Sequence, residues 1–167
     1  DFLDKNNLLN NLSSIDKFIQ PNMVSEKKYD FVLGGKNTTT KFQVDPSFRN
    51  FFYVADGELE VILSPPENNN KMNMYKDYYN FEFISSINPF LAENKEKVKN
   101  FSKIELKLVK GQLLFIPAYW FYSFKFNETI LIHFNYKTYM NQLSILPDYL
   151  IHFMQRMNVK KKREDKL

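Results

Sequence analysis

The chain has no cysteine, and it contains only four glycines, two histidines and one tryptophan in 167 residues. Without cysteine it forms no disulfide, no thiolate metal site and no cysteine nucleophile. No Walker or Rossmann pattern occurs, and four glycines argue against a glycine-built phosphate site. These absences exclude several common classes of nucleotide-binding and thiol-dependent enzymes.

Membrane and secretion signals are also missing from the given sequence. No apolar run reaches the length of a membrane span, and the first residues do not form a secretory signal. With the lack of cysteine, this favours an intracellular location in the cytoplasm, an organelle or a virus particle. The formal charge of +4 includes a basic run at residues 160–163, but Glu164 and Asp165 follow it. We therefore interpret the tail as a solvated terminus and rank nucleic-acid binding last.

The abundant residues indicate one mainly β domain. Aromatic residues make up 17% of the chain, which favours strands, and 167 residues suffice for one core. Apolar residues spaced by three and four predict a helix before Pro21, and a second helix is expected near Pro147. Between them, apolar runs and turn residues predict strands at 29–33, 38–44, 51–55, 58–63, 103–110 and 129–136, and a short helix at 92–100. The segment at 75–84 is aromatic but less regular. Asp56-Gly57 predicts a hairpin, 127–128 a turn, and 68–70 a surface insertion.

Two segments carry a family resemblance. Gly111–Phe124 reads GQLLFIPAYWFYSF and resembles the word GDVLFIPPGWWHQV of JmjC-type and related cupin domains. Thr40–Pro46 reads TKFQVDP and resembles the family's T-P-L-H-Y-D-P. The segment at 132–137 is similar to V-N-F-W-Y-K of asparaginyl-hydroxylase-like members. The resemblance covers about residues 29–137 and implies a double-stranded β-helix, a cupin or jelly-roll barrel.

The resemblance also implies a division of the chain and a degenerate metal site. We expect a helical extension at 1–28, the barrel at 29–140, and a C-terminal helix with a basic tail at 141–167. Many family members hold iron(II) with two histidines and a carboxylate, and the matching positions here are Gln43, Asp45 and Tyr122. A glutamine amide is a weak neutral ligand, and a tyrosine must lose its proton to bind well. We therefore expect no metal and no cofactor.

The positions that match the 2-oxoglutarate pocket are altered as well. Leu59 replaces the anchoring lysine, and Glu58 and Glu60 beside it are expected to repel a dicarboxylate. His133 replaces a strand asparagine, whereas Thr40 and Asn50 remain as polar pocket groups.

Each former site residue also has a structural interpretation. Asp45 is expected to accept a turn hydrogen bond or to pair with Lys41 or Arg49. Tyr122 is expected to fill the metal position with its hydroxyl bound to Gln43 or Asp45. His133 is interpreted as a hydrogen-bonded core residue, and the lone Trp120 as core or rim packing.

These residues predict a non-catalytic domain that acts as a structural or scaffolding subunit of a larger assembly. The terminal helices are the expected contact surfaces, to other proteins or to a second copy, through the apolar residues Leu150, Ile151, Met154 and Met157. One alternative is an oxygenase-like enzyme with an atypical metal site of Asp45, His133 and Tyr122. Another is a module that binds a small ligand or a peptide in a cavity near Thr40 and Tyr122.

Overall fold

The computed structural model describes residues 8–164, and the side chains of residues 12–158. No helix among these residues is both long enough and apolar enough to cross a membrane. The described elements, in chain order, are α2 (Leu8–Ile19), β1 (Val24–Gly34), β2 (Gln43–Val44), β3 (Arg49–Ser64), η1 (Pro66–Lys71), β4 (Met74–Asp77), β5 (Glu82–Ser85), η2 (Ala92–Asn94), α3 (Lys95–Lys99), β6 (Ile104–Val109), β7 (Leu113–Pro117), β8 (Phe121–Thr138), α4 (Tyr139–Ser144) and α5 (Leu146–Glu164).

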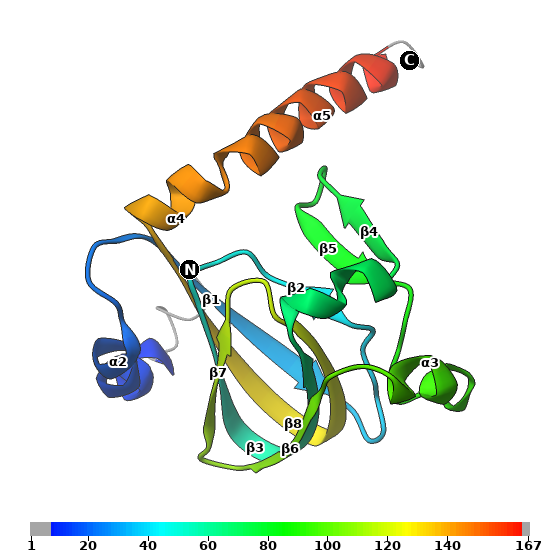
Figure 1. Cartoon of the computed structure of the whole chain (residues 1–167). Coiled ribbons are helices and arrows are strands. Elements are labelled where there is room, and N and C mark those ends of the chain that lie inside the picture. The colour runs from blue at the N-terminus through cyan, green and yellow to red at the C-terminus, as the bar shows by residue number, and fades with distance from the viewer. Residues whose placement is uncertain (1–7, 165–167) are drawn as a thin grey trace.

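Two long strands, β3 and β8, organise the barrel (Figure 1). They pair antiparallel from Arg49–Tyr136 at one end to Ser64–Phe121 at the other. One half of this ladder is flanked by β1 and β7, and the other half by β2 and β6, with β5 and β4 beyond β2. The mainly β fold with flanking helices is therefore confirmed.

The predicted hairpin at Asp56-Gly57 and the predicted turn at 127–128 are wrong. The strands β3 and β8 run through both positions, and their register shifts on either side of Asp56. Gly57 has φ +79° and Glu128 has φ +50°, so both lie in the left-handed region. A Cβ on Gly57 would lie 2.1 Å from the Glu128 carbonyl oxygen. The positive φ that suits a hairpin also suits a bulge, and here the bulges bend two paired strands.

Other predicted boundaries shift by smaller amounts. β1 begins at Val24, so the barrel starts before residue 29 and the predicted boundary after residue 28 falls inside a strand. Only Gln43–Val44 is a strand within the predicted 38–44. The segment at 75–84 divides into β4 and β5, and 68–70 lies in η1, where Asn68 is buried and donates to Ser64.

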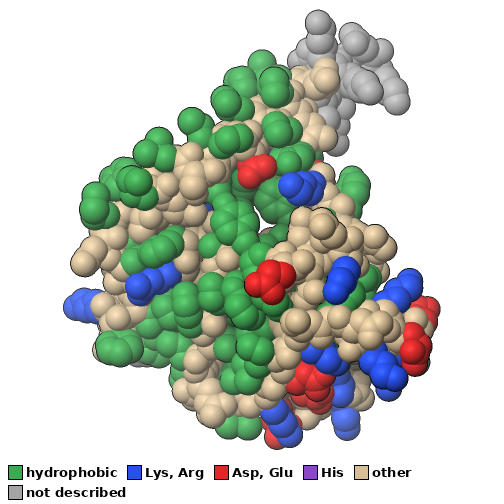
Figure 2. All heavy atoms as spheres, viewed as in Figure 1, with side chains coloured by type: hydrophobic (Ala, Val, Ile, Leu, Met, Phe, Trp, Pro, Cys, Tyr) green, Lys and Arg blue, Asp and Glu red, His purple; other side chains and the backbone are tan. Residues whose placement is uncertain are grey.

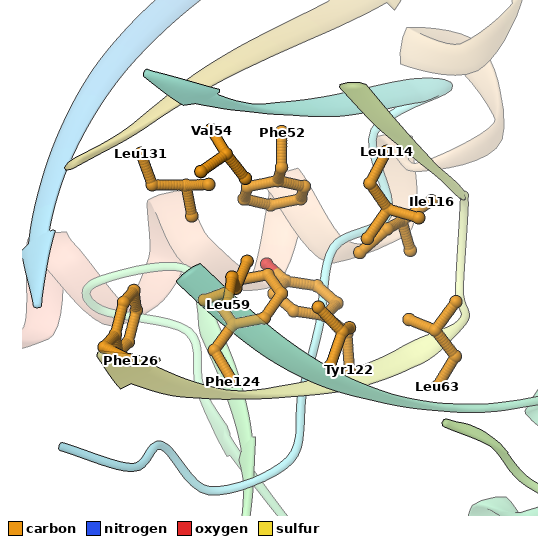
Figure 3. Packing of buried hydrophobic residues seen from close by; sticks show 11 residues of the cluster. Phe52, Val54, Leu59, Leu63, Leu114, Ile116, Tyr122, Phe124, Phe126 and Leu131 are labelled. Atoms are coloured by element: carbon orange, nitrogen blue, oxygen red, sulfur yellow. The ribbon is translucent and has the colours of Figure 1, made fainter. Parts of the chain in front are cut away.

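The barrel interior is a closely packed apolar cluster. Figure 3 shows its side chains converging from both halves of the barrel, and the buried members are Phe52, Val54, Leu59, Val61, Leu63, Leu114, Ile116, Tyr122, Phe124, Phe126 and Leu131. Trp120 is half-buried against this cluster. Aromatic rings thus fill the space that an open barrel would leave for a ligand.

The helix α2 packs on the outside of the barrel through Leu12, Ile15 and Ile19. Phe18, which the periodicity assigned to the same face, is instead 88% exposed. The side chains of Leu8 and Leu9 lie outside the described residues. The helix α5 leaves the barrel beyond α4 and extends away from it (Figure 1).

Candidate functional site at the barrel mouth

Asp45 follows β2 and lies at the mouth of the barrel. Its Oδ1 accepts the backbone N–H of Ser47 and its Oδ2 accepts the side-chain amide of Asn135, each at 2.7 Å. The carboxylate is therefore a turn acceptor, one of the two roles that the sequence suggested. No ion pair joins it to Lys41 or Arg49 in the described part of the chain.

Asn135 connects Asp45 to the buried polar residues of β3 and β8. Its amide nitrogen also donates to Oδ1 of Asn50 at 2.8 Å. Asn50 is fully buried and donates to the Ser47 carbonyl at 3.3 Å, while Nε2 of His133 lies 3.3 Å from Asn50 Oδ1. Residues from three segments thus form one hydrogen-bonded network at the former metal site.

His133 ends this network on the β1 side. The strand register places it between Asp30 and Phe52 on one face of the sheet. Its ring stacks on Phe52 with centroids 4.2 Å apart, and its Nδ1 lies 3.7 Å from Asp30 Oδ2. The imidazole lowers the pKa of Asp30 to about 2, and the Lys28 ammonium at 3.0 Å acts in the same direction. His133 is therefore a buried, partnered side chain.

Tyr122 occupies the position of the family's second histidine, and its Cα is paired with that of Gln43. Its ring packs among aromatic rings, 5.4 Å from Phe52 and 5.2 Å from Phe124 (Figure 3). Burial raises the pKa of Tyr122 well above its usual range, and the carboxylate of Asp45 adds to the effect. No hydrogen bond joins its hydroxyl to Gln43 or Asp45 among the described side chains, so that prediction is wrong.

The side chains at two of the former cosubstrate positions have structural roles within the barrel. Thr40 is bound to β8, because its hydroxyl accepts the backbone N–H of Phe124 at 2.9 Å and its own N–H donates to the Phe124 carbonyl. Leu59 is fully buried in the interior cluster. Neither side chain is free to bind a ligand at the mouth.

The predicted repulsion by the glutamates beside Leu59 is not supported. Glu58 pairs with Lys107 and Glu60 with Lys125, each at 2.9 Å, and both carboxylates are about half exposed. Because side chains alternate along a strand, the buried Leu59 between them points inward and both glutamates point outward. Their charges lie outside the barrel.

A polar cavity of about 370 Å³ opens at the mouth. Its lining includes the former ligand positions and two lysines: Gln43, Asp45, Tyr122, Asn135, Lys28 and Lys137. Thr40 is not part of it. The cavity is therefore a polar recess above an apolar plug, and only part of the predicted cavity near Thr40 and Tyr122 exists.

The residues at this site do not fit iron(II). Gln43 offers only a neutral amide, Tyr122 holds its proton because it is buried, and both oxygens of Asp45 already accept hydrogen bonds. No cluster of three or more histidine, aspartate or glutamate side chains with metal-binding geometry occurs in the described residues. Across the same residues, every fully buried side-chain nitrogen and oxygen has a hydrogen-bond partner.

Comparison with known proteins agrees with the architecture. The chain belongs to the family of cupin-like domains, whose model matches residues 3–142. Among solved structures it is similar to hydroquinone 1,2-dioxygenase from Sphingomonas sp. TTNP3 with 4-hydroxybenzoate bound. That match has 14% sequence identity and a TM-score of 0.44, and covers 74% of this chain and 71% of the other. No curated protein matches the chain.

The predicted contact residues on the C-terminal helix are exposed. Leu150, Ile151, Met154 and Met157 are between 38% and 62% exposed. The neighbouring Leu146 and Phe153 are exposed as well, and the sequence analysis missed them. The basic run at 160–163 lies beyond the described side chains.

Sequence reasoning also missed Asn135 and Asp30. Asn135 lies two residues after His133 on one strand, so alternation puts both side chains on the same face. This spacing could have identified Asn135. Asp30 could not be found this way, because its contact with His133 depends on how β1 pairs with β8.

Proposed function

We propose that this chain is a non-catalytic cupin-like domain that serves as a structural or scaffolding subunit of a larger assembly. The observation that carries the proposal is the Asp45 carboxylate, whose two oxygens accept hydrogen bonds from Ser47 and Asn135. A metal would have to displace the Asn135 amide. Hydrogen bonds to charged groups contribute roughly 1.5–3 kcal/mol each, so displacing this amide would oppose metal binding by about that amount.

The polar network behind Asp45 supports the same conclusion. Asn50 is fully buried and shares its Oδ1 between Asn135 and His133, so all three side chains hold one another in place. Fully satisfied buried networks stabilise a single packing arrangement. An atypical metal site of Asp45, His133 and Tyr122 would have to break this network and deprotonate a buried phenol.

The C-terminal helix supports an interaction role. One side of α5 contacts the connection between β4 and β5, where Tyr149 stacks on Phe81 at 5.0 Å and Asp148 accepts the Tyr78 hydroxyl at 3.2 Å. Its other side carries the exposed apolar side chains named above. Figure 2 shows hydrophobic side chains along the surface of this helix. Contiguous exposed apolar residues of this kind mark protein–protein contact sites. We therefore assign α5 as the surface that engages another protein or a second copy.

An oxygen-consumption assay tests the absence of catalysis. The full chain is incubated with iron(II), ascorbate and 2-oxoglutarate, and oxygen uptake and succinate are measured against an iron-only control. We expect no difference between wild type, Asp45→Ala and the control. Succinate formation that requires wild-type Asp45 would refute the non-catalytic assignment.

The mouth cavity favours a second candidate function, a module that binds a small polar ligand. Its polar lining and volume of about 370 Å³ fall within the range of ligand sites. Thermal unfolding in the presence of pools of polar metabolites tests whether the mouth cavity binds such a ligand. A rise in the unfolding temperature that Asn135→Ala abolishes would favour the binding module.

A further inference from the structure

A second cavity lies on the outside of the barrel, under the start of α5. Its volume is about 320 Å³, and it is separate from the apolar cluster that fills the barrel. The register pairs Val44 with both Phe83 and Phe121, so these three side chains lie in one row across β5, β2 and β8. Together with Met74, this row makes an apolar floor.

The rest of the lining of this outer cavity is mostly apolar. Pro46, Pro66 and Tyr119 contribute to it, together with the polar Asn69. Tyr119 has φ +64°, a conformation that bulky residues rarely adopt, and its N–H donates to the Asp45 carbonyl at 3.0 Å. Strained residues persist where the surrounding structure holds them, and they cluster at functional sites. The aromatic side chain of Tyr119 is therefore held against the cavity at some cost to stability.

The charged groups at the rim differ in their partners. Asp148, in the first turn of α5, accepts the hydroxyl of Tyr78. The Lys76 ammonium lies 5.9 Å from the centre of the Phe83 ring and makes no ion pair within residues 12–158. Lys76 is thus a cation over an aromatic floor, available to an anion that enters the cavity.

We propose that the outer cavity binds a small aromatic carboxylate. The ring of the ligand packs in the apolar part of the cavity, against the half-buried Val44 and Met74, and its carboxylate pairs with the Lys76 ammonium. The volume matches a small molecule, because ligand cavities of about 300 Å³ are mostly apolar with a few polar groups that fix orientation. The outer cavity shares Val44, Pro46 and Phe83 with the mouth cavity. Gln43, Asn135 and Tyr122 line only the mouth cavity, whereas Met74, Lys76 and Phe121 line only the outer one.

Two-dimensional amide NMR on the full chain tests the proposal, with phenylacetate as the probe and phenylacetamide as its neutral isostere. We expect phenylacetate to shift the amides of Met74, Tyr119 and Phe121, which line only the outer cavity, with a millimolar Kd. Lys76→Gln should weaken phenylacetate binding about tenfold, because one charge-assisted contact is lost. It should leave the weaker binding of phenylacetamide unchanged. The matched control, Lys36→Gln, removes an exposed lysine from a distant turn and should bind phenylacetate as the wild type does.

A second variant fills the cavity from its rim without disturbing the core. Pro66→Trp replaces an exposed residue and should abolish the shifts while the unfolding temperature stays near that of the wild type. Three results would overturn the proposal: no shift at 10 mM probe (a concentration about tenfold above the expected Kd), equal affinity for the acid and the amide, or shifts centred on Gln43 and Asn135. The last result would place the ligand in the mouth cavity.

Discussion

Replacing Asp16 by alanine should lower the stability of the protein by about 3 kcal/mol, because this carboxylate joins α2 to the barrel. Its Oδ1 accepts the hydroxyls of Tyr29 at 2.8 Å and Tyr136 at 2.5 Å. Its Oδ2 lies 3.4 Å from the Lys27 ammonium. Tyr136 is fully buried, so its hydroxyl cannot turn to solvent when the acceptor is removed.

The magnitude follows from the two hydroxyl contacts. A hydrogen bond to a charged group contributes roughly 1.5–3 kcal/mol, and we take the lower figure because the Asp16 side chain is 20% exposed. Water can then form part of the hydrogen bonds that the tyrosine hydroxyls lose with Asp16. The contact with Lys27 adds little, since exposed ion pairs contribute about 0–1 kcal/mol.

Urea unfolding followed by circular dichroism measures this loss. In a background that carries Tyr29→Phe and Tyr136→Phe, Asp16→Ala should cost less than about 1 kcal/mol, because the partners are already gone. The control Asp56→Ala removes an exposed carboxylate paired with Lys110 and should leave the midpoint unchanged. An undiminished loss in the double-phenylalanine background would refute the reasoning.

Three further predictions concern the bulge and the ionisable groups. Gly57→Ala should cost at least about 2 kcal/mol in urea unfolding, because its Cβ meets the opposite backbone at φ +79°. Asp30→Asn should cost about 1 kcal/mol at pH 7, allowing for a side chain that is 37% exposed. The difference in stability between wild type and Asp30→Asn should disappear as the pH falls from about 4 to 2, because the folded pKa of Asp30, about 2, lies below its unfolded value. Stability should fall above about pH 10, because burial raises the folded pKa values of Tyr122 and Tyr136 above the unfolded value. The part of the tyrosinate absorbance that Tyr122→Phe and Tyr136→Phe remove should appear only when the protein unfolds.

The fold class could be predicted from the sequence because it rests on local patterns. The alternation of Ile104, Leu106 and Leu108 in the segment at 103–110 predicted a strand, and this segment forms β6. A hairpin and a bulge could not be distinguished from the local sequence. Asp56-Gly57 has the same local chemistry in both, and only the unbroken pairing of β3 with β8 decides between them.

The candidate site was only partly predictable for a similar reason. The replacement of two histidines by Gln43 and Tyr122 can be read directly from the chain. The closure of Asp45 by Asn135 cannot, because the two residues are 90 positions apart and meet only through the tertiary fold. The outward orientation of Glu58 and Glu60 depended on which face of β3 is buried.

The metal content of the full chain is the sharpest test of a domain that holds no iron. The protein is incubated anaerobically with iron(II), with and without 2-oxoglutarate, desalted, and its iron is measured alongside Asp45→Ala. We predict that wild type retains no more iron than the variant under either condition. About one iron per chain in the wild type, lost in Asp45→Ala, would contradict it.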